Sequence, residues 1–260
     1  MNLEEKEKKT FPAHGKIACK DCYTDGLANI ENEKWKMRND PGAWGAVNPE
    51  YLVLGFSKGA TQTDIYDNGP FDDVAFGEKR TRNNLTDILK KIDLLEPDSN
   101  IGEHINKNSN RFHFASLVRC SLSRMCDKTY KEKNIKSYKT SGALINKSFS
   151  EIPSIINRCT SKYLGSFPPS LKAIIVLGVG DSYIKKMKAL VKNIHFDTYS
   201  EINEVSYKTG NVFWIHVTHP SKANGTIKAW LKGDVNDSSG LKSSMAKKLI
   251  EDNNLKIKSQ

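Results

Sequence analysis

A histidine follows a strongly apolar segment in the last quarter of the chain. Residues 212–217 (Val-Phe-Trp-Ile-His-Val) are rich in β-branched and aromatic side chains, which predicts a buried strand. The strand should stop at Thr218-His219-Pro220-Ser221, because proline cannot continue a central strand. His219 is therefore expected just beyond the carboxyl end of a strand, where open α/β sheets bind their ligands. An ordinary polar loop histidine is the alternative interpretation.

The cysteines are a second set of residues that could do chemistry. Cys19 and Cys22 form a C-x-x-C, a spacing that lets two thiolates reach one metal centre. The chain has five cysteines in all, and in a reducing compartment this number indicates metal or redox chemistry before structural disulfides. The five are Cys19, Cys22, Cys120, Cys126 and Cys159.

Short apolar runs that alternate with helical patterns must position these residues. The predicted strands are residues 51–55, 111–118, 171–178 and 212–217, and the predicted helices lie near 80–92, 149–163, 184–191 and 240–254. Such alternation implies a parallel sheet covered on both faces. We therefore predict an α/β protein of three layers, α/β/α, with a central four-stranded, mainly parallel sheet.

The first predicted strand leads into a glycine-bracketed loop, Gly55-Phe56-Ser57-Lys58-Gly59, whose glycines allow tight turns near a ligand. More than twenty residues separate this strand from the helix expected near Arg80. Loops of that length in a compact domain are usually functional.

The composition of the chain bears on its binding partner and on the compartment in which we expect it. The net charge of +10 over 260 residues favours a polyanionic partner, with nucleic acid the first candidate. There is no run of about 18 apolar residues and no apolar signal segment at the start, so we expect a cytoplasmic protein without a membrane span. We expect one domain over residues 1–260, a monomer, with residues 1–15 flexible. Residues 121–147 are expected to form a mobile basic insertion that either contacts nucleic acid or is a solvated surface loop.

The order of these motifs resembles the uracil-DNA glycosylase superfamily, and within it the iron–sulfur class. The resemblance rests on motifs at the ends of all four predicted strands, over residues 19 to about 225. They are Gly55-Phe56-Ser57-Lys58-Gly59 followed by Pro70-Phe71, then Val118-Arg119-Cys120 (similar to the family's V-K-C), Leu177-Gly178, and His219-Pro220-Ser221 (similar to its H-P-x).

The resemblance implies a metal centre that ties the N-terminal segment to the sheet. The iron–sulfur class has a C-x-x-C near the N-terminus, a cysteine after the second strand and one on the following helix. These positions correspond to Cys19, Cys22, Cys120 and Cys159, which implies a [4Fe–4S] cluster, with a structural zinc as the alternative. Cys126 is left over, either as a replacement for Cys120 or as a free thiol.

Three residues in two motifs depart from the family pattern and bear on the substrate. The family's glycine loop carries a carboxylate or amide where this chain has Phe56 and Ser57, and its uracil-reading asparagine corresponds to Ser116. Serine has a shorter reach than an amide and lacks its paired donor and acceptor. We therefore predict a modified or damaged base, for example a modified cytosine of phage DNA in antiviral defence, in place of plain uracil.

The resemblance also implies roles for individual residues. We expect His219 to stabilise the departing base, and Asp72 or Asp73 to replace the missing water-activating group. The base-binding candidates are Phe56, Ser57, Phe71, Phe76 and Ser116, and the DNA-binding candidates are Lys58, Arg119, Ser221 and Lys222. Core packing is the alternative for the phenylalanines, and a solvated side chain is the alternative for the charged residues.

The predicted function is a monofunctional DNA glycosylase that leaves an abasic site, because the motif loops offer no lysine–carboxylate pair for lyase chemistry. A catalytically inactive nucleic-acid-binding module on the same fold is the alternative. A zinc-stapled hydrolase or sensor of free nucleotides is the third hypothesis.

Overall fold

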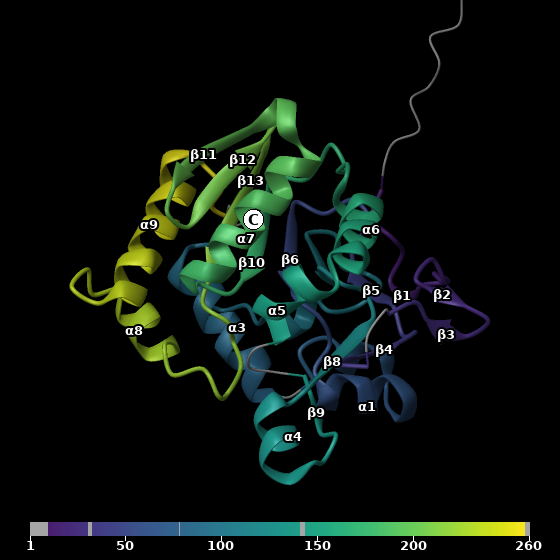
Figure 1. Ribbon diagram of the computed structural model, residues 1–260. Coiled ribbons are helices and arrows are strands. Elements are labelled where there is room, and N and C mark those ends of the chain that lie inside the picture. Colours follow the sequence, from purple (N-terminus) through teal and green to yellow (C-terminus); the bar gives the residue numbers. More distant parts are fainter. Residues whose placement is uncertain (1–9, 31–32, 78, 141–143, 258–260) are drawn as a thin grey trace, which may run out of the picture.

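The computed structural model describes residues 10–30, 33–77, 79–140 and 144–257, and within them a mixed sheet forms the centre of the molecule (Figure 1). Its eight strands lie in the order β1-β5-β7-β6-β10-β13-β12-β11. In that order they are Gly15–Lys16, Gly42–Gly45, Phe112–Ser116, Tyr51–Gly55, Ala173–Leu177, Val212–Val217, Ser206–Thr209 and Tyr199–Asn203. A hairpin of β2 (Tyr23–Thr24) and β3 (Leu27–Ala28) and a three-stranded sheet of β4 (Trp35–Arg38), β8 (Ser121–Met125) and β9 (Tyr138–Lys139) stand beside it.

The four predicted strands are neighbours at the centre of this sheet. β7, β6, β10 and β13 run parallel, which confirms that part of the prediction. Gly55 pairs with Ser116, and Leu177 pairs with Val217, so the carboxyl ends of all four strands meet at one edge. The sheet is larger than predicted, because short antiparallel strands extend it on both sides.

Helices cover both faces of the sheet, which confirms the three-layer architecture (Figure 1). Alternate residues of β6 explain the two layers: Tyr51 and Val53 belong to one hydrophobic cluster, and Leu52 and Leu54 belong to the other. The first cluster takes side chains from α3 (Lys79–Lys91), α8 (Ile227–Lys232) and α9 (Ser238–Asp252). The second takes them from α5 (Leu144–Glu151), α6 (Pro153–Leu164) and α7 (Asp181–Ile194).

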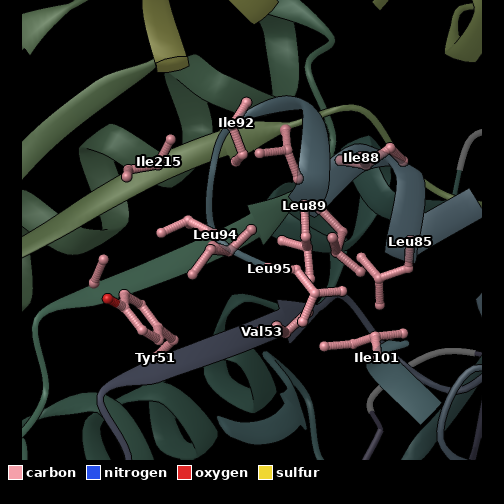
Figure 2. Close-up of a cluster of buried hydrophobic side chains, with 14 of the residues drawn as sticks. Tyr51, Val53, Leu85, Ile88, Leu89, Ile92, Leu94, Leu95, Ile101 and Ile215 are labelled. Atoms are coloured by element: carbon pink, nitrogen blue, oxygen red, sulfur yellow. The ribbon is translucent and has the colours of Figure 1, made fainter. Parts of the chain in front are cut away.

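The helix α3 shows how the sequence pattern becomes packing. Leu85, Ile88 and Leu89 recur at helical spacing and are fully buried against Val53 and its neighbours (Figure 2). Truncation of one such leucine to alanine typically costs about 2–5 kcal/mol. This layer therefore fixes the sheet from which the loops of the site project.

Three expectations about the loops need correction. The long loop after β6 contains α1 (Ala60–Asn68) and α2 (Phe71–Val74). None of the residues of α1 is buried, so it lacks the apolar stripe by which a helix is recognised in a sequence. The expected mobile insertion, residues 121–147, forms β8, α4 (Asp127–Lys133), β9 and the start of α5, with residues 141–143 outside the described part.

Part of the predicted flexible start, residues 10–15, has a defined structure. Residues 1–9 lie outside the described part of the chain, but Phe11 is buried, and its ring stacks on His113 with centroids 4.7 Å apart. Two 3-10 helices, Ile101–His104 and Phe196–Thr198, complete the described elements. No helix in this part of the chain is long and apolar enough to cross a membrane.

Candidate functional site

A cavity lies at the carboxyl edge of the four parallel strands. It has a volume of about 690 Å³, and residues from or after each of these strands line it. Seven of the predicted site residues are among them: Phe56, Ser57, Phe76, Ser116, His219, Ser221 and Lys222. The structure thus brings most of the predicted base-binding side chains to one pocket.

The imidazole of His219 has a defined orientation in this pocket. The backbone N–H of Ser221 donates a hydrogen bond to Nδ1 of His219 over 3.1 Å. Nδ1 must therefore present its lone pair, which places the proton of the neutral ring on Nε2. Burial lowers the pKa of His219, because a charged ring is poorly solvated there. The site therefore holds a neutral histidine whose Nε2–H is a hydrogen-bond donor.

Side-chain amides hold the loop that carries His219. Nδ2 of Asn224 donates to the carbonyl oxygen of His219 over 2.6 Å and to Oγ1 of Thr218 over 2.9 Å. From the other side, Nδ2 of Asn84 on α3 donates to the carbonyl oxygen of Pro220 over 2.8 Å. The polar residues after Pro220 thus fix a turn and do not merely mark the end of a strand.

The opposite wall of the pocket consists of the glycine loop and the end of β7. Gly55 and Ser116 are paired residues on adjacent strands, so Ser57 and Ser116 stand on neighbouring strand ends. Three threonines missed by the sequence analysis add hydroxyl groups to the lining, Thr61, Thr81 and Thr140. Among the described lining residues there is no carboxylate.

Aromatic rings form an apolar part of the pocket. Phe76 has a positive φ of 61°, which is uncommon for a residue with a bulky side chain. Its ring meets that of Phe114 edge to face, with centroids 5.9 Å apart. Backbone held in a sparsely populated region is often found at ligand sites. Phe56 also lines the pocket, although it is almost fully buried among Phe149 and Tyr183.

Phe71 is not among the pocket residues. Its ring stacks on that of Trp44 with centroids 5.0 Å apart, and its carbonyl oxygen accepts a hydrogen bond from Trp44 Nε1 over 2.8 Å. The core-packing alternative is therefore the correct one for Phe71. Trp44 itself lines the pocket, and no sequence pattern indicated it because it lies on the short strand β5.

The two predicted water-activating carboxylates do not reach the pocket. Oδ1 of Asp72 pairs with Nε2 of His14 at 2.8 Å, and Oδ1 of Asp73 pairs with Nη1 of Arg82 at 3.5 Å. Both carboxylates are about half exposed and neither lines the cavity around His219. The structure therefore does not bring either of them together with the candidate histidine.

Two of the predicted phosphate contacts are wrong because their side chains are buried. Lys58 is 1% exposed and Arg119 is 2% exposed, so neither can contact a DNA backbone. Lys222 is exposed and Ser221 is partly exposed, and both lie at the pocket. These two remain candidates for phosphate contact.

A second, small cavity of about 20 Å³ lies between the N-terminal segment and α6. All four predicted metal-binding cysteines line it: Cys19, Cys22, Cys120 and Cys159. Cys126 is not among its lining residues and stands at the start of α4. Burial raises the pKa of Cys120 to about 12 and that of Cys159 to about 11. Within the described residues no three His, Cys, Asp or Glu side chains are grouped as ligands of one metal ion.

Buried hydrogen-bond donors surround the cysteine cavity. The hydroxyls of Tyr23 and Tyr163 lie beside the thiols of Cys120 and Cys19, and neither has an oxygen or nitrogen partner within the described residues. The three guanidinium nitrogens of Arg119 also lack a partner in that part of the chain, and its Cζ lies 4.8 Å from the centre of the Tyr163 ring. Desolvation lowers the pKa of Arg119 to about 10. Such a set of unpaired donors suits an anionic group bound by the thiolates.

The chain has structural similarity to solved proteins. No protein-family model and no curated protein matches the chain. The crystal structure of wild-type Pedobacter heparinus SMUG2 aligns with 91% of this chain and 94% of its own, with 10% sequence identity and a TM-score of 0.46.

Proposed function

We propose that this protein is a DNA N-glycosylase that hydrolyses the bond between a flipped-out base and its sugar. The observation that carries the proposal is His219, a neutral, oriented donor in a pocket at the carboxyl edge of the sheet. The likeness of the motif order to the uracil-DNA glycosylase superfamily supports the same function, as does the net positive charge of the chain.

The reaction requires stabilisation of charge on the base. As the bond between C1′ of the sugar and the base nitrogen breaks, its electron pair passes to the base and the sugar becomes cationic. Nε2–H of His219 donates a hydrogen bond to the negative base, which lowers the barrier to departure. Water adds to C1′ and loses a proton. The departing base takes up a proton, and an abasic site remains.

The pocket holds the extruded base between aromatic and polar walls. Phe76 and Phe114 offer ring surfaces, and Ser57 and Ser116 offer hydroxyl groups that pair with polar substituents. A volume of about 690 Å³ exceeds what a plain pyrimidine fills, and three threonine hydroxyls add further partners. We therefore propose a modified base as substrate, with hydroxymethyl- or glucosyl-cytosine of phage DNA as candidates in an antiviral setting.

The cysteine cavity is proposed to hold a [4Fe–4S] cluster. Four cysteine side chains line one cavity, and the nearby donors of Arg119, Tyr23 and Tyr163 suit the negative charge of a cluster bound by thiolates. A single zinc would need all its ligands within about 2.3 Å of one centre, whereas a cluster spreads them over four irons. When bound, the cluster supplies a structural link between the N-terminal segment, Cys120 and α6.

The test is an abasic-site assay on duplexes and single strands that contain uracil, hypoxanthine, xanthine, hydroxymethylcytosine or glucosylated cytosine. Cleavage of one substrate after alkali treatment, lost in His219→Ala with an unchanged melting temperature, is the expected result. Absence of cleavage across the panel by protein with its full metal content would overturn the glycosylase proposal. Metal analysis of anaerobically purified protein separates iron from zinc, and stoichiometric zinc without iron would overturn the cluster.

A second candidate function follows from the missing carboxylate in the described pocket lining. Without a carboxylate, the described lining lacks a general base that activates water. This favours a nucleic-acid-binding module without catalytic activity. Retained binding of DNA by a protein that cleaves no substrate would support this function.

A further inference from the structure

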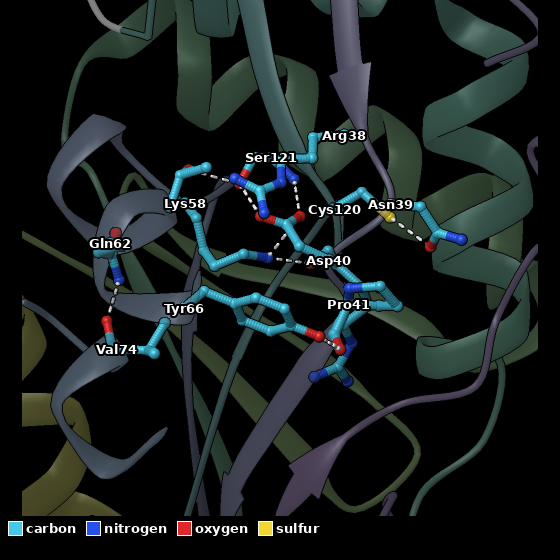
Figure 3. A network of polar contacts seen from close by, with 12 residues as sticks. Arg38, Asn39, Asp40, Pro41, Lys58, Gln62, Tyr66, Val74, Cys120 and Ser121 are labelled. Carbon is cyan, nitrogen blue, oxygen red and sulfur yellow. Dashed lines mark hydrogen bonds and ion pairs between the residues drawn. The ribbon is translucent and has the colours of Figure 1, made fainter. Parts of the chain in front are cut away.

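The side chain of Lys58 turns away from the base pocket although its neighbours form the pocket wall. Ser57 and Gly59 line the cavity, but Lys58 is buried and its Nζ lies 3.3 Å from Oδ1 of Asp40 (Figure 3). Asp40 lies between β4 and β5 and is completely buried. A fully desolvated ion pair thus stands directly behind the glycine loop.

The same pair holds the backbone on both sides of Cys120. Nζ of Lys58 donates a hydrogen bond to the carbonyl oxygen of Arg119 over 2.5 Å. Oδ1 of Asp40 accepts from the backbone N–H of Ser121 over 2.7 Å, and Oδ2 accepts from its hydroxyl over 2.5 Å. Cys120 is therefore fixed by contacts to the peptide groups immediately before and after it.

The network returns to the glycine loop by a second route. The hydroxyl proton of Ser121 is donated to Asp40, and the hydroxyls of Thr63 and Ser121 lie 2.7 Å apart. Thr63 has a single hydroxyl proton, which it donates either to Ser121 or to the carbonyl oxygen of Gly59, 3.0 Å away. A ring of polar contacts thus joins the pocket wall and the cysteine cavity through Lys58, Asp40, Ser121, Thr63 and Gly59.

Stability alone is a poor explanation for this arrangement. Burying two charges removes them from water, and a well-packed apolar pair of the same volume often serves stability equally well. The ion pair adds geometric specificity, because Lys58 and Asp40 each form a hydrogen bond to a backbone atom of another segment.

We infer that the Lys58–Asp40 pair is a positioning device that sets the glycine loop of the base pocket against the segment that carries Cys120. The pocket wall and the cysteine site then move as one unit, and a change at either one is transmitted to the other. The catalytic consequence rests on the proposed glycosylase function, since a displacement of about 1 Å at a reacting site can cost about 10²-fold in rate.

Amide hydrogen exchange of DNA-free protein tests the coupling without reliance on activity. Lys58→Met and Asp40→Asn each remove one partner, and Thr63→Val removes only the second route and leaves no unpaired charge. The matched control is Lys172→Met, which breaks an exposed pair with Glu50 (2.6 Å) at the opposite end of the strands.

We expect at least tenfold faster exchange in residues 55–59 and 119–121 for Lys58→Met and Asp40→Asn, a smaller increase for Thr63→Val, and none for the control. Cys120→Ser should accelerate exchange in residues 55–59 as well. Amide exchange in the double variant of Lys58→Met and Asp40→Asn should be no faster than in the single variant with the faster exchange. If Lys58→Met and Asp40→Asn do not fold, Thr63→Val and Cys120→Ser decide the question in the same two segments.

Unchanged exchange in residues 55–59 in folded variants, with faster exchange only at 119–121, would overturn the positioning role. Where the wild type cleaves a substrate, the variants should lower kcat more than they raise KM. A wild type that cleaves nothing overturns the glycosylase function, whereas the exchange data still decide whether the two sites are coupled.

Discussion

Nδ2 of Asn224 donates a 2.6 Å hydrogen bond to the carbonyl oxygen of His219, the residue whose ring faces the pocket. The same amide nitrogen reaches Oγ1 of Thr218, so one side chain holds two consecutive residues of the turn. A donor that acts on a transient charge must already be in place when the charge forms. We therefore expect Asn224 to contribute to function through position, and His219 through contact with the base.

Substitutions at these two residues should differ in size. We expect His219→Ala to lower the single-turnover rate of base release by about 10²–10³-fold, the usual cost of removing one such donor. Asn224→Ala keeps the imidazole and should lose only about tenfold. Asn236→Ala is the control, because its side chain donates to the nearby Asp234 on an exposed loop. Equal losses for His219→Ala and the control would contradict the assignment.

Ser116 should determine which bases fit. Asparagine at this position fills part of the pocket and offers a paired donor and acceptor, so it should disfavour a bulky substituted base and favour plain uracil. We expect Ser116→Asn to shift the ratio of kcat/KM values toward uracil by about 10–100-fold, in competition assays on mixed substrates. Ser116→Ala does not fill the pocket and is the matched control. An equal shift in both variants would contradict a role of residue 116 in the choice of base.

The sequence pattern was sufficient to predict a strand where both of its faces are buried along its whole length. Residues 51–55 and 212–217 are apolar throughout because both faces of β6 and β13 are covered, so their strands and the place of His219 could be predicted. The strand β11 is largely exposed and β5 has only four residues, two of them glycine, so neither has a clear pattern.

The direction in which side chains point could not be predicted from the sequence. Lys58 and Arg119 have the residue type of a phosphate contact, yet both are buried by segments distant in the chain. Cys126 was the alternative to Cys120 as a ligand, and of the two only Cys120 lines the cavity. Burial of a charged group depends on tertiary partners such as Asp40, and no local pattern encodes that.

Arg119 should have opposite effects on metal-free and loaded protein. Its guanidinium is buried without a partner in the described residues, a cost of about 1–3 kcal/mol for unpaired donors. We expect Arg119→Met to raise the free energy of unfolding of metal-free protein by about that amount, and to accelerate loss of cluster absorbance. Lys172→Met is the control, since it removes a positive charge that is exposed and paired with Glu50 (2.6 Å). Lower stability in both forms would contradict a role as counter-charge.

Two buried histidines make the fold sensitive to acid. Burial lowers the pKa of His216 to about 4 and that of His113 to about 3, against about 6.5 when unfolded. Between these values the unfolded chain binds more protons, so stability is present above pH 6.5 and is lost as the pH falls toward 4. For His216 alone this amounts to about 3 kcal/mol. Urea unfolding of metal-free protein at several pH values should show the loss, and His216→Asn should reduce the slope.

Lys222 is the exposed cation next to the pocket, and it should contact the phosphate backbone beside the extruded nucleotide. Removal of one such contact lowers the slope of log Kobs against log salt concentration by about 0.9 for duplex DNA. We expect Lys222→Ala to weaken binding of all sequences alike, with that change in slope, in fluorescence anisotropy titrations between low and moderate salt. Lys172→Ala, at the opposite end of the strands, changes the net charge equally and should leave the slope unaltered. An identical slope change for both lysines would mean that general attraction, and not a contact at the pocket mouth, accounts for the effect of Lys222.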